Sequence, residues 1–401
     1  MIGVDASSFF AVVATAAVAA LAAAALPAAR TPPVVVIELL LGIVIGPQVL
    51  GLADSDSFIE FFSNLGLGLL FFFAGYEIDF DRIKGAPLRL AGLGWALSLG
   101  IAYGLGGLLA AAGVVISFLF TGSALATTAI GTLIPIMRDS RELPTTFGTY
   151  LLAAGAVGEF GPIVLVTVVL STGRPLTEAL VLAGFAVLAV AVAAASVRFA
   201  ARGWPVAEKA LETSSQLPVR LVMVLIFGLA GLASDLGLDL LLGGFVAGMI
   251  VRIALRGREL AVFESKLTAV GFGFLIPFFF VTSGLNFDLD ALVSGVEPIA
   301  KMVLFLALFL VVRGVPAVLL YRRPLPVARD RAALAFFSAT QLPLVVAITT
   351  LAVSEGEMTT QTAASLVGAA ILSTLIFPFV GLALRRRTRA GDDPAAPPVP
   401  A

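Results

Sequence analysis

One carboxylate lies deep inside a long apolar stretch of this sequence. Glu159 is near the middle of the run from Leu151 to Ser171, and that run contains no lysine or arginine to neutralise it. A charge at the centre of a bilayer costs about 2.5–3.5 kcal/mol on insertion scales, so such a group usually faces the protein interior or a water-filled cavity. A carboxylate in that position can hold a proton or a metal cation. Glu159 is therefore our leading candidate for a transport site.

Two further groups of polar residues are expected near the middle of the membrane, each in an apolar segment that also contains glycine or proline. They are Thr127 and Thr128 in the segment 115–136, and Ser338, Thr340 and Gln341 in the segment 331–352. Glycine and proline at that depth favour interrupted helices, whose freed carbonyl groups and helix ends can bind ions. The alternative is that the hydroxyl groups only bond within ordinary helices or mediate close packing. That alternative is favoured for any single threonine, whereas several polar midpoints at one depth favour a site.

Arg313 is the one basic residue predicted to lie far from a membrane face. Arginine stays protonated in proteins, so at that depth it needs a partner or water. It could form a static and purely structural ion pair with Glu159. It could equally compete with a bound cation for that carboxylate, and the sequence leaves both interpretations open.

The composition is that of an integral membrane protein. Hydrophobic residues make up 59% of the 401 residues and charged residues only 13%, against about 25% charged in soluble domains. The absence of cysteine and histidine excludes disulfides, thiolate metal sites and the usual pH-sensing side chain. No nucleophile–base or metal-ligand constellation is visible without these residues. We therefore expect neither an enzyme, nor a cofactor, nor a nucleic-acid partner, and any proton sensing must use carboxylates.

Thirteen segments are long and apolar enough to cross the bilayer as helices, which takes about 20 residues each. The first of them is expected to be retained, because the start of the chain lacks the basic residues of a cleaved signal peptide. The predicted spans are 8–29, 33–52, 62–79, 88–112, 115–136, 145–171, 176–197, 218–235, 238–255, 266–286, 299–321, 331–352 and 360–384. The sequence thus predicts an all-α, polytopic membrane protein.

The basic residues separate by side of the membrane when these thirteen spans are assumed. Apart from Arg174, Lys301 and Arg313, every lysine and arginine falls on the side that also holds the carboxy terminus. Because basic loops stay in the cytoplasm, we expect a protein of the cell (inner) membrane with its amino terminus outside and its carboxy terminus cytoplasmic.

Two short patterns recur about seven spans apart. Residues 38–42, Glu-Leu-Leu-Leu-Gly, return as Asp-Leu-Leu-Leu-Gly at 239–243, and the Gly-x-x-x-Asp-x-Asp spacing that begins at Gly75 returns at Gly284. An odd number of intervening spans places the copies in opposite orientations, which is the architecture of secondary transporters. Chance similarity of leucine-rich runs is the alternative, and the paired acidic spacing favours a repeat. The predicted organisation is an extra helix at 1–32, a first inverted repeat at 33–172, connecting helices at 173–235, a second inverted repeat at 236–385 and a disordered cytoplasmic tail at 386–401.

The same segments resemble the monovalent cation:proton antiporters, in particular the Kef-type branch. Residues 38–51, Glu-Leu-Leu-Leu-Gly-Ile-Val-Ile-Gly-Pro-Gln-Val-Leu-Gly, are similar to the second-span signature of that family. Residues 72–79 and 277–289 are similar to its two Gly-Leu-x-x-Asp motifs. The likeness covers nearly all of residues 8–385. It implies a core of two crossed, unwound helices, a homodimer and an elevator-like motion.

The resemblance also implies roles for particular residues. It places Thr127 and Thr128 at the first helix crossover and makes Glu159 the essential acid. In the family an Asn, Asp or Gln precedes an aspartate, whereas this chain has Gly158 before a glutamate. Arg313 falls where many members carry a basic residue. The nucleotide-binding domain of many Kef-type proteins is not expected to follow.

The expected function is exchange of protons for a monovalent cation, Na+ or K+, at one carboxylate. Burial disfavours the ionised form of Glu159, while Arg313 or a bound cation favours it. Proton and cation would therefore exclude each other, and one carboxylate predicts an electroneutral exchange. A sodium-coupled symporter of a small organic anion on the same fold is the alternative, with Arg313 as the anion clamp. A membrane sensor without transport would not need an acid at this depth.

Overall fold

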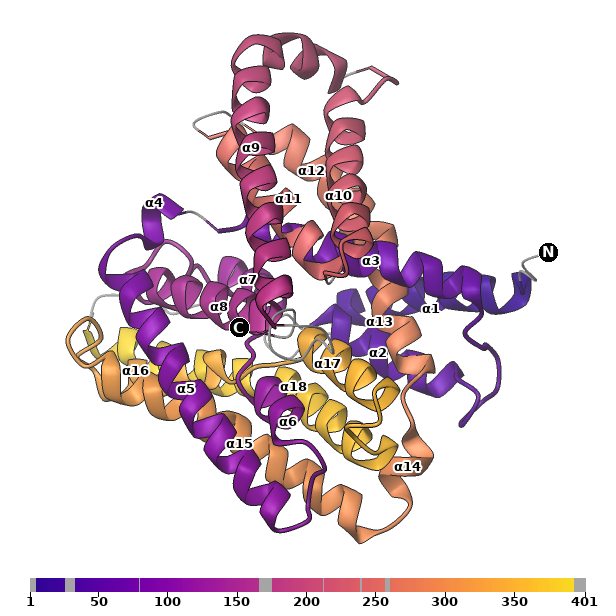
Figure 1. The fold of residues 1–401 in the computed structure, drawn as a ribbon, viewed down its shortest axis with the longest axis vertical. Helices are drawn as coiled ribbons and strands as arrows, with labels where there is room; N and C mark the ends of the chain where they lie inside the picture. The colour runs from indigo at the N-terminus through magenta and orange to yellow at the C-terminus, as the bar shows by residue number, and fades with distance from the viewer. Residues whose placement is uncertain are drawn as a thin grey trace. The chain divides into compact units, whose positions relative to one another are not determined.

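The computed structural model describes residues 5–25, 33–78, 80–165, 175–211, 213–238, 240–256 and 260–392, and every regular element within them is helical (Figure 1). The elements are α1 (Ala6–Ala25), α2 (Val34–Ile45), α3 (Ser57–Tyr76), α4 (Phe80–Ile83), α5 (Ala86–Ala111), α6 (Phe118–Leu125), α7 (Ile130–Asp139), α8 (Thr146–Leu165), α9 (Pro175–Leu211), α10 (Leu217–Asp235), α11 (Leu240–Ala254), α12 (Ala261–Val270), the π-helical turn η2 (Gly271–Leu275), α13 (Ile276–Leu285), α14 (Leu289–Val293), α15 (Val296–Leu320), α16 (Ala328–Ser338), α17 (Pro343–Ser354) and α18 (Thr360–Asp392).

The helices account for the predicted spans. Among the described residues, nine helices are long and apolar enough to cross a membrane, and a tenth span results if α16 and α17 are joined across their 41° bend. Three shorter apolar helices, Val34–Ile45, Phe118–Ile134 and Leu240–Ala254, fall on the predicted second, fifth and ninth spans. The prediction of an all-α, polytopic membrane protein of about thirteen spans is confirmed.

The chain forms two compact units, and each is built from separate stretches of sequence. The first combines the residues up to Ala16 with Ala53–Phe80 and Ile163–Thr282. The second combines Ala17–Leu52, Asp81–Pro162 and the chain from Ser283 onward. These units do not follow the repeat boundaries at 33–172 and 236–385, which stay a prediction.

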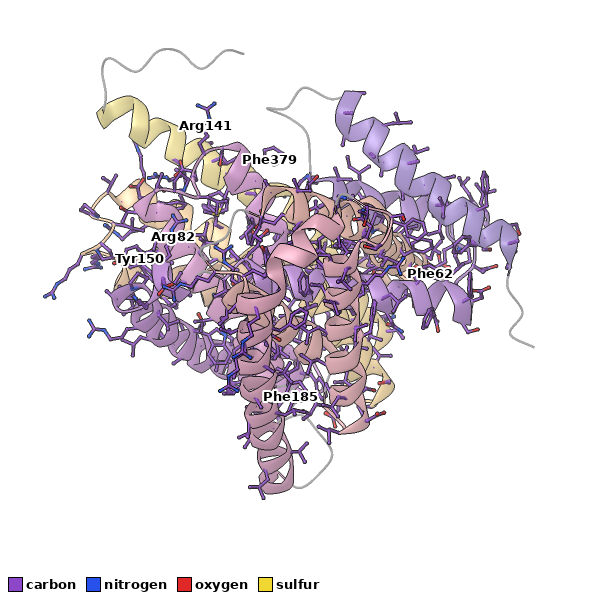
Figure 2. The ribbon with its side chains drawn as sticks, turned by 90° about the horizontal axis from the view of Figure 1, so that it is seen from above. Phe62, Arg82, Arg141, Tyr150, Phe185 and Phe379 are labelled. Atoms are coloured by element: carbon purple, nitrogen blue, oxygen red, sulfur yellow. The ribbon has the colours of Figure 1, made fainter. Side chains whose placement is uncertain are left out.

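The first unit is held together by close helix contact and by aromatic packing. Carbonyl oxygens approach two glycines so closely that a side chain at Gly75 would overlap the Phe245 carbonyl, and one at Gly248 the Phe72 carbonyl. Small residues at such crossings let α3 and α11 pack backbone to backbone. Phe62 belongs to a cluster of phenylalanine rings and lies 5.1 Å from Phe278, ring centre to ring centre (Figure 2).

The second unit contains both interrupted helices. The chain leaves helical geometry at residues 126–129, between α6 and α7, and again at residues 339–342, between α16 and α17. Around them, α15 packs against α5, α16 and α18, and α18 also packs against α16 and α17. Both breaks lie where the sequence predicted discontinuous helices, so this part of the fold prediction is confirmed.

Candidate functional site

The two breaks meet through short polar contacts within the second unit. The Thr128 hydroxyl donates to the Ser338 carbonyl at 2.6 Å, and the Ala129 amide donates to the Thr340 carbonyl at 2.8 Å. These bonds satisfy carbonyl groups that an unbroken helix would pair internally, as buried backbone requires. The segments around Thr128 and Thr340 therefore cross in direct contact.

Gln341 fastens the crossing from the side of α17. Its amide oxygen accepts from the Thr127 hydroxyl at 2.9 Å, and its amide nitrogen donates to the Leu125 carbonyl at 3.0 Å. The Gln341 backbone is bound by two hydroxyl groups of α18, because Ser373 exchanges hydrogen bonds with it and Thr374 donates to its carbonyl at 3.0 Å. The polar atoms of Gln341 are thus used to shape the crossing.

Arg313 of α15 reaches the same crossing and is only 4% exposed. Its Nε donates to the Thr128 hydroxyl at 2.9 Å and to the Ser338 carbonyl at 3.4 Å. Its Nη1 donates to Ser98 at 3.2 Å, and its Nη2 donates to the Ala154 carbonyl at 3.2 Å. All of these acceptors are neutral oxygen atoms. The guanidinium is therefore bound by the crossing and by α8 without needing a carboxylate.

Glu159 lies on α8, where the helix touches the crossing. Its side chain is 2% exposed, and the carbonyl of the preceding residue, Gly158, accepts from the Thr128 amide at 3.0 Å. Thr128 therefore contacts both α8 and Arg313. The structure brings the predicted residues of both breaks to one place, with Arg313 bonded to Thr128 and Ser338, and with Glu159 on the helix that Thr128 contacts.

Several residues at the crossing were missed by reasoning from sequence. Ser98 binds Arg313, the Trp95 indole donates to the Ala126 carbonyl at 3.2 Å, and Ser373 and Thr374 bind Gln341. Each is a polar group inside an apolar predicted span, which is the signal that could have found them. Glu38 of α2 is a further buried acid, because the residue is 3% exposed.

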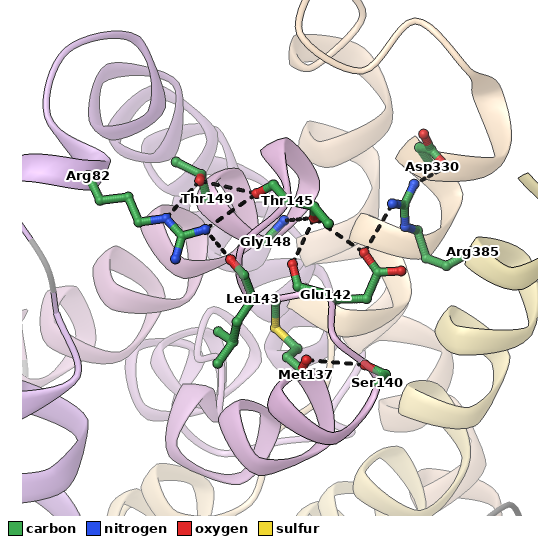
Figure 3. Close-up of polar contacts among 10 residues, drawn as sticks. All are labelled: Arg82, Met137, Ser140, Glu142, Leu143, Thr145, Gly148, Thr149, Asp330 and Arg385. Atoms are coloured by element: carbon green, nitrogen blue, oxygen red, sulfur yellow. Dashed lines mark hydrogen bonds and ion pairs between the residues drawn. The ribbon is translucent and has the colours of Figure 1, made fainter. Parts of the chain in front are cut away.

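A second charged cluster joins the turn after α7 and the first turn of α16 to α18 (Figure 3). Arg385 Nη2 binds Glu142 Oε2 at 3.0 Å and Arg385 Nη1 binds Asp330 Oδ1 at 2.6 Å. The guanidinium also lies 4.5 Å from the ring centre of Phe147. Arg82 of α4 donates to Thr149 of α8 at 3.0 Å and to the Leu143 carbonyl in the same turn. This cluster connects the start of one interrupted helix to the end of the other.

Among the described residues, no group of three or more acidic side chains could hold a metal ion.

Comparisons with known proteins match this architecture. The family model described as "Sodium/hydrogen exchanger, transmembrane" matches residues 12–382. YjbQ of Bacillus subtilis is 26% identical over 381 residues, which are 90% of this chain and 60% of YjbQ. The Na+/H+-K+ antiporter GerN of Bacillus cereus is 26% identical over 267 residues, which are 65% of this chain and 67% of GerN. The chain thus spans about 60% of the length of YjbQ.

The fold is similar to that of a solved transporter. The sodium proton antiporter MjNhaP1 from Methanocaldococcus jannaschii superposes with a TM-score of 0.61 at 16% identity, covering 95% of this chain and 97% of that one. The family model spans nearly the whole chain, and the structural similarity covers 95% of it, so both comparisons point to the same kind of protein. The chain belongs to the sodium/hydrogen exchanger family, which consists of multi-pass membrane transporters and not of enzymes.

Proposed function

We propose that this protein is a secondary active antiporter that exchanges protons for a monovalent cation, Na+ or K+. The observation that carries the proposal is a buried carboxylate, Glu159, on the helix that contacts the first of two crossed helix breaks. Freed backbone dipoles and one acid at such a crossing can replace the hydration shell of a small cation. The family membership supports the same activity.

The exchange rests on one site that proton and cation occupy in turn. A buried carboxylate is stable when it is protonated or paired with a cation, and unfavourable when it is bare. Each conversion of Glu159 from one form to the other therefore releases one ion as it takes up the other. With a single titrating carboxylate the exchange carries one charge in each direction and is electroneutral.

The two threonines take different parts in this proposal. The Thr128 hydroxyl donates to Ser338 and accepts from Arg313, so its role is to position the crossing. The Thr127 hydroxyl donates to Gln341 or to the Ala124 carbonyl, which leaves its oxygen available as a ligand. Thr127 and Glu159 are the side chains that we assign to the cation.

Arg313 does not favour the organic-anion symporter. Its Nε, Nη1 and Nη2 all donate to oxygen atoms of the protein, so a substrate carboxylate would have to displace these contacts. We propose instead that Arg313 is a fixed positive charge near the site, which weakens cation binding enough to allow release.

The assembly is proposed on the sequence pattern and on the family. The basic loops predict an amino terminus outside and a cytoplasmic carboxy terminus in the cell (inner) membrane. We further propose a homodimer in which inverted repeats at 33–172 and 236–385 provide alternating access.

The test is a dye-dequenching assay with purified protein in acid-loaded vesicles, in which Li+, Na+, K+ and Rb+ are added in turn. Wild type should release protons on addition of at least one cation. Glu159→Gln, which keeps the shape of the protonated acid, should show none, while Glu60→Gln on the same protein serves as the matched control. Full activity of Glu159→Gln would refute the assignment.

A further inference from the structure

The residue before the candidate acid has no side chain, and the structure shows what uses that space. A carbon atom added at Gly158 would overlap Arg313 Nη2 and would lie 2.7 Å from Thr128 Oγ1 and 3.0 Å from Thr128 Cβ. Contacts this short do not occur between real side chains, so any other residue at 158 must displace the guanidinium, the threonine or both. Both are bound groups with little freedom to move.

The guanidinium lies along one face of α8. Its Nη2, the atom that a new side chain would strike, donates to the carbonyl of Ala154, one turn before Gly158. Its Nε is bound to Thr128, the second group that would be struck. A side chain at 158 would therefore disrupt both contacts. These contacts fix the distance of the Arg313 charge from α8 and from Glu159, the residue after Gly158.

We propose that Gly158 is a positioning residue that sets cation affinity by allowing Arg313 to be held by neutral oxygen atoms of α8 and the crossing. This inference rests on the proposed antiport function. When a guanidinium loses its acceptor in a buried site, it is driven to the strongest acceptor within reach. On α8 that acceptor is the neighbouring carboxylate, so the displaced charge competes with the transported cation.

The experiment is a double-mutant cycle between positions 158 and 313, read as the KM for Na+ or K+ and the maximal rate in proteoliposomes. Gly158→Ala should raise the cation KM about tenfold, the factor expected for loss of one charge-assisted hydrogen bond, with a smaller change in maximal rate. In an Arg313→Ala background the same substitution should change KM much less, because the contact with the guanidinium is then absent and only the contact with Thr128 remains. Arg313→Gln provides a second background should the alanine variant not fold.

Gly155→Ala is the matched control on the same helix. Its added carbon would crowd Ile130, lying 2.7 Å from Cγ1, and would meet no charged group. Its effect on KM should be the same whether or not Arg313 is present. An equal KM change for Gly158→Ala in both backgrounds, or none in wild type, would overturn the inference.

The thermal unfolding midpoint of the same variants separates this inference from the proposed function. If the wild type moves no cation, the antiport proposal fails. The steric coupling of 158 with 313 would still appear, because Gly158→Ala should lower the midpoint more in wild type than in the Arg313→Ala background, where only the contact with Thr128 remains. If the unfolding midpoints show no coupling between positions 158 and 313, the close packing of Gly158 against Arg313 is contradicted.

Discussion

Thr128 is the side chain on which the crossing depends most. It donates to Ser338, accepts from Arg313 and binds α8 through its backbone amide. Thr128 thus bonds to the arginine, to α8 and to the end of α16. Substitution there tests geometry, and substitution of Thr127 tests cation ligation.

Thr128→Val should reduce transport at least about tenfold, because an isosteric methyl group leaves Arg313 Nε and the Ser338 carbonyl without this partner. Thr128→Ser, which keeps the hydroxyl, should remain within about threefold of wild type. Initial rates of cation-driven proton release at equal protein density measure both. Equal activity of the valine and serine variants would show that the hydroxyl is dispensable.

Arg313→Lys should not preserve the stability and the cation affinity of the wild-type protein. Lysine carries the charge but cannot present the planar fork that binds Thr128, Ser98 and Ala154 at once. We expect a lower unfolding midpoint and a changed cation KM, measured on purified protein and in vesicles. A lysine variant with the wild-type unfolding midpoint and cation KM would show that only the positive charge of Arg313 matters.

The ends of the interrupted helices are joined by the cluster of Glu142, Asp330 and Arg385 (Figure 3). All three are buried, and removing one member of a buried ion pair typically costs about 3–5 kcal/mol. Arg385→Ala should therefore lower stability strongly in a thermal or denaturant unfolding assay.

The control for that prediction is Lys301→Ala. Lys301 binds Glu297 at 2.8 Å, but the Glu297 side chain is 75% exposed, and exposed pairs contribute about 0–1 kcal/mol. A larger loss from Lys301→Ala than from Arg385→Ala would contradict this ranking of the two contacts.

The contact of α3 with α11 makes an equally direct prediction. Gly248→Ala should severely reduce folded yield, because the new methyl group would overlap the Phe72 carbonyl, which is backbone and cannot rotate away. Gly228→Ala on α10, where nothing lies within 4 Å of the added carbon, should be tolerated. Fluorescence-detected size-exclusion chromatography measures the folded yield of both variants. Equal yields would contradict the prediction.

The breaks in the helices were predictable, and their contacts were not. Glycine, proline and hydroxyl residues near Thr128 and Thr340 predict interrupted helices, because they weaken the backbone hydrogen bonding of a helix inside the membrane. Which acceptor Arg313 would choose cannot be read from sequence. Glu159 was the obvious charged partner, whereas the structure offers neutral oxygen atoms on Ser98 and Ala154. That choice depends on the packing of α5, α8 and α15.

The order of the helices along the chain could be predicted from sequence, whereas their grouping into compact units was not predicted. Hydropathy defines each span separately, while the units join stretches that are distant in sequence, such as Ala53–Phe80 with Ile163–Thr282. Close backbone contact, such as that of Gly75 on α3 with the Phe245 carbonyl of α11, determines those partners. The hydropathy pattern of a single span does not indicate which other helix it packs against.

The orientation of the chain can be tested with single cysteines, because the sequence has none of its own. Ser294 and Ser214 are both exposed, and the basic-loop pattern places Ser294 outside and Ser214 in the cytoplasm. An impermeant maleimide applied to intact cells should label Ser294→Cys and spare Ser214→Cys until the cells are opened. The reverse pattern would invert the proposed topology.

The most direct test of one shared site is the number of protons released when a cation binds. Calorimetric titration of the purified protein in buffers of different ionisation enthalpy measures that number without requiring transport. Around the pH at which Glu159 is protonated, we predict about one proton released per Na+ or K+ bound, and no cation binding to Glu159→Gln. Cation binding without proton release, or undiminished release from Glu159→Gln, would contradict exchange at this carboxylate.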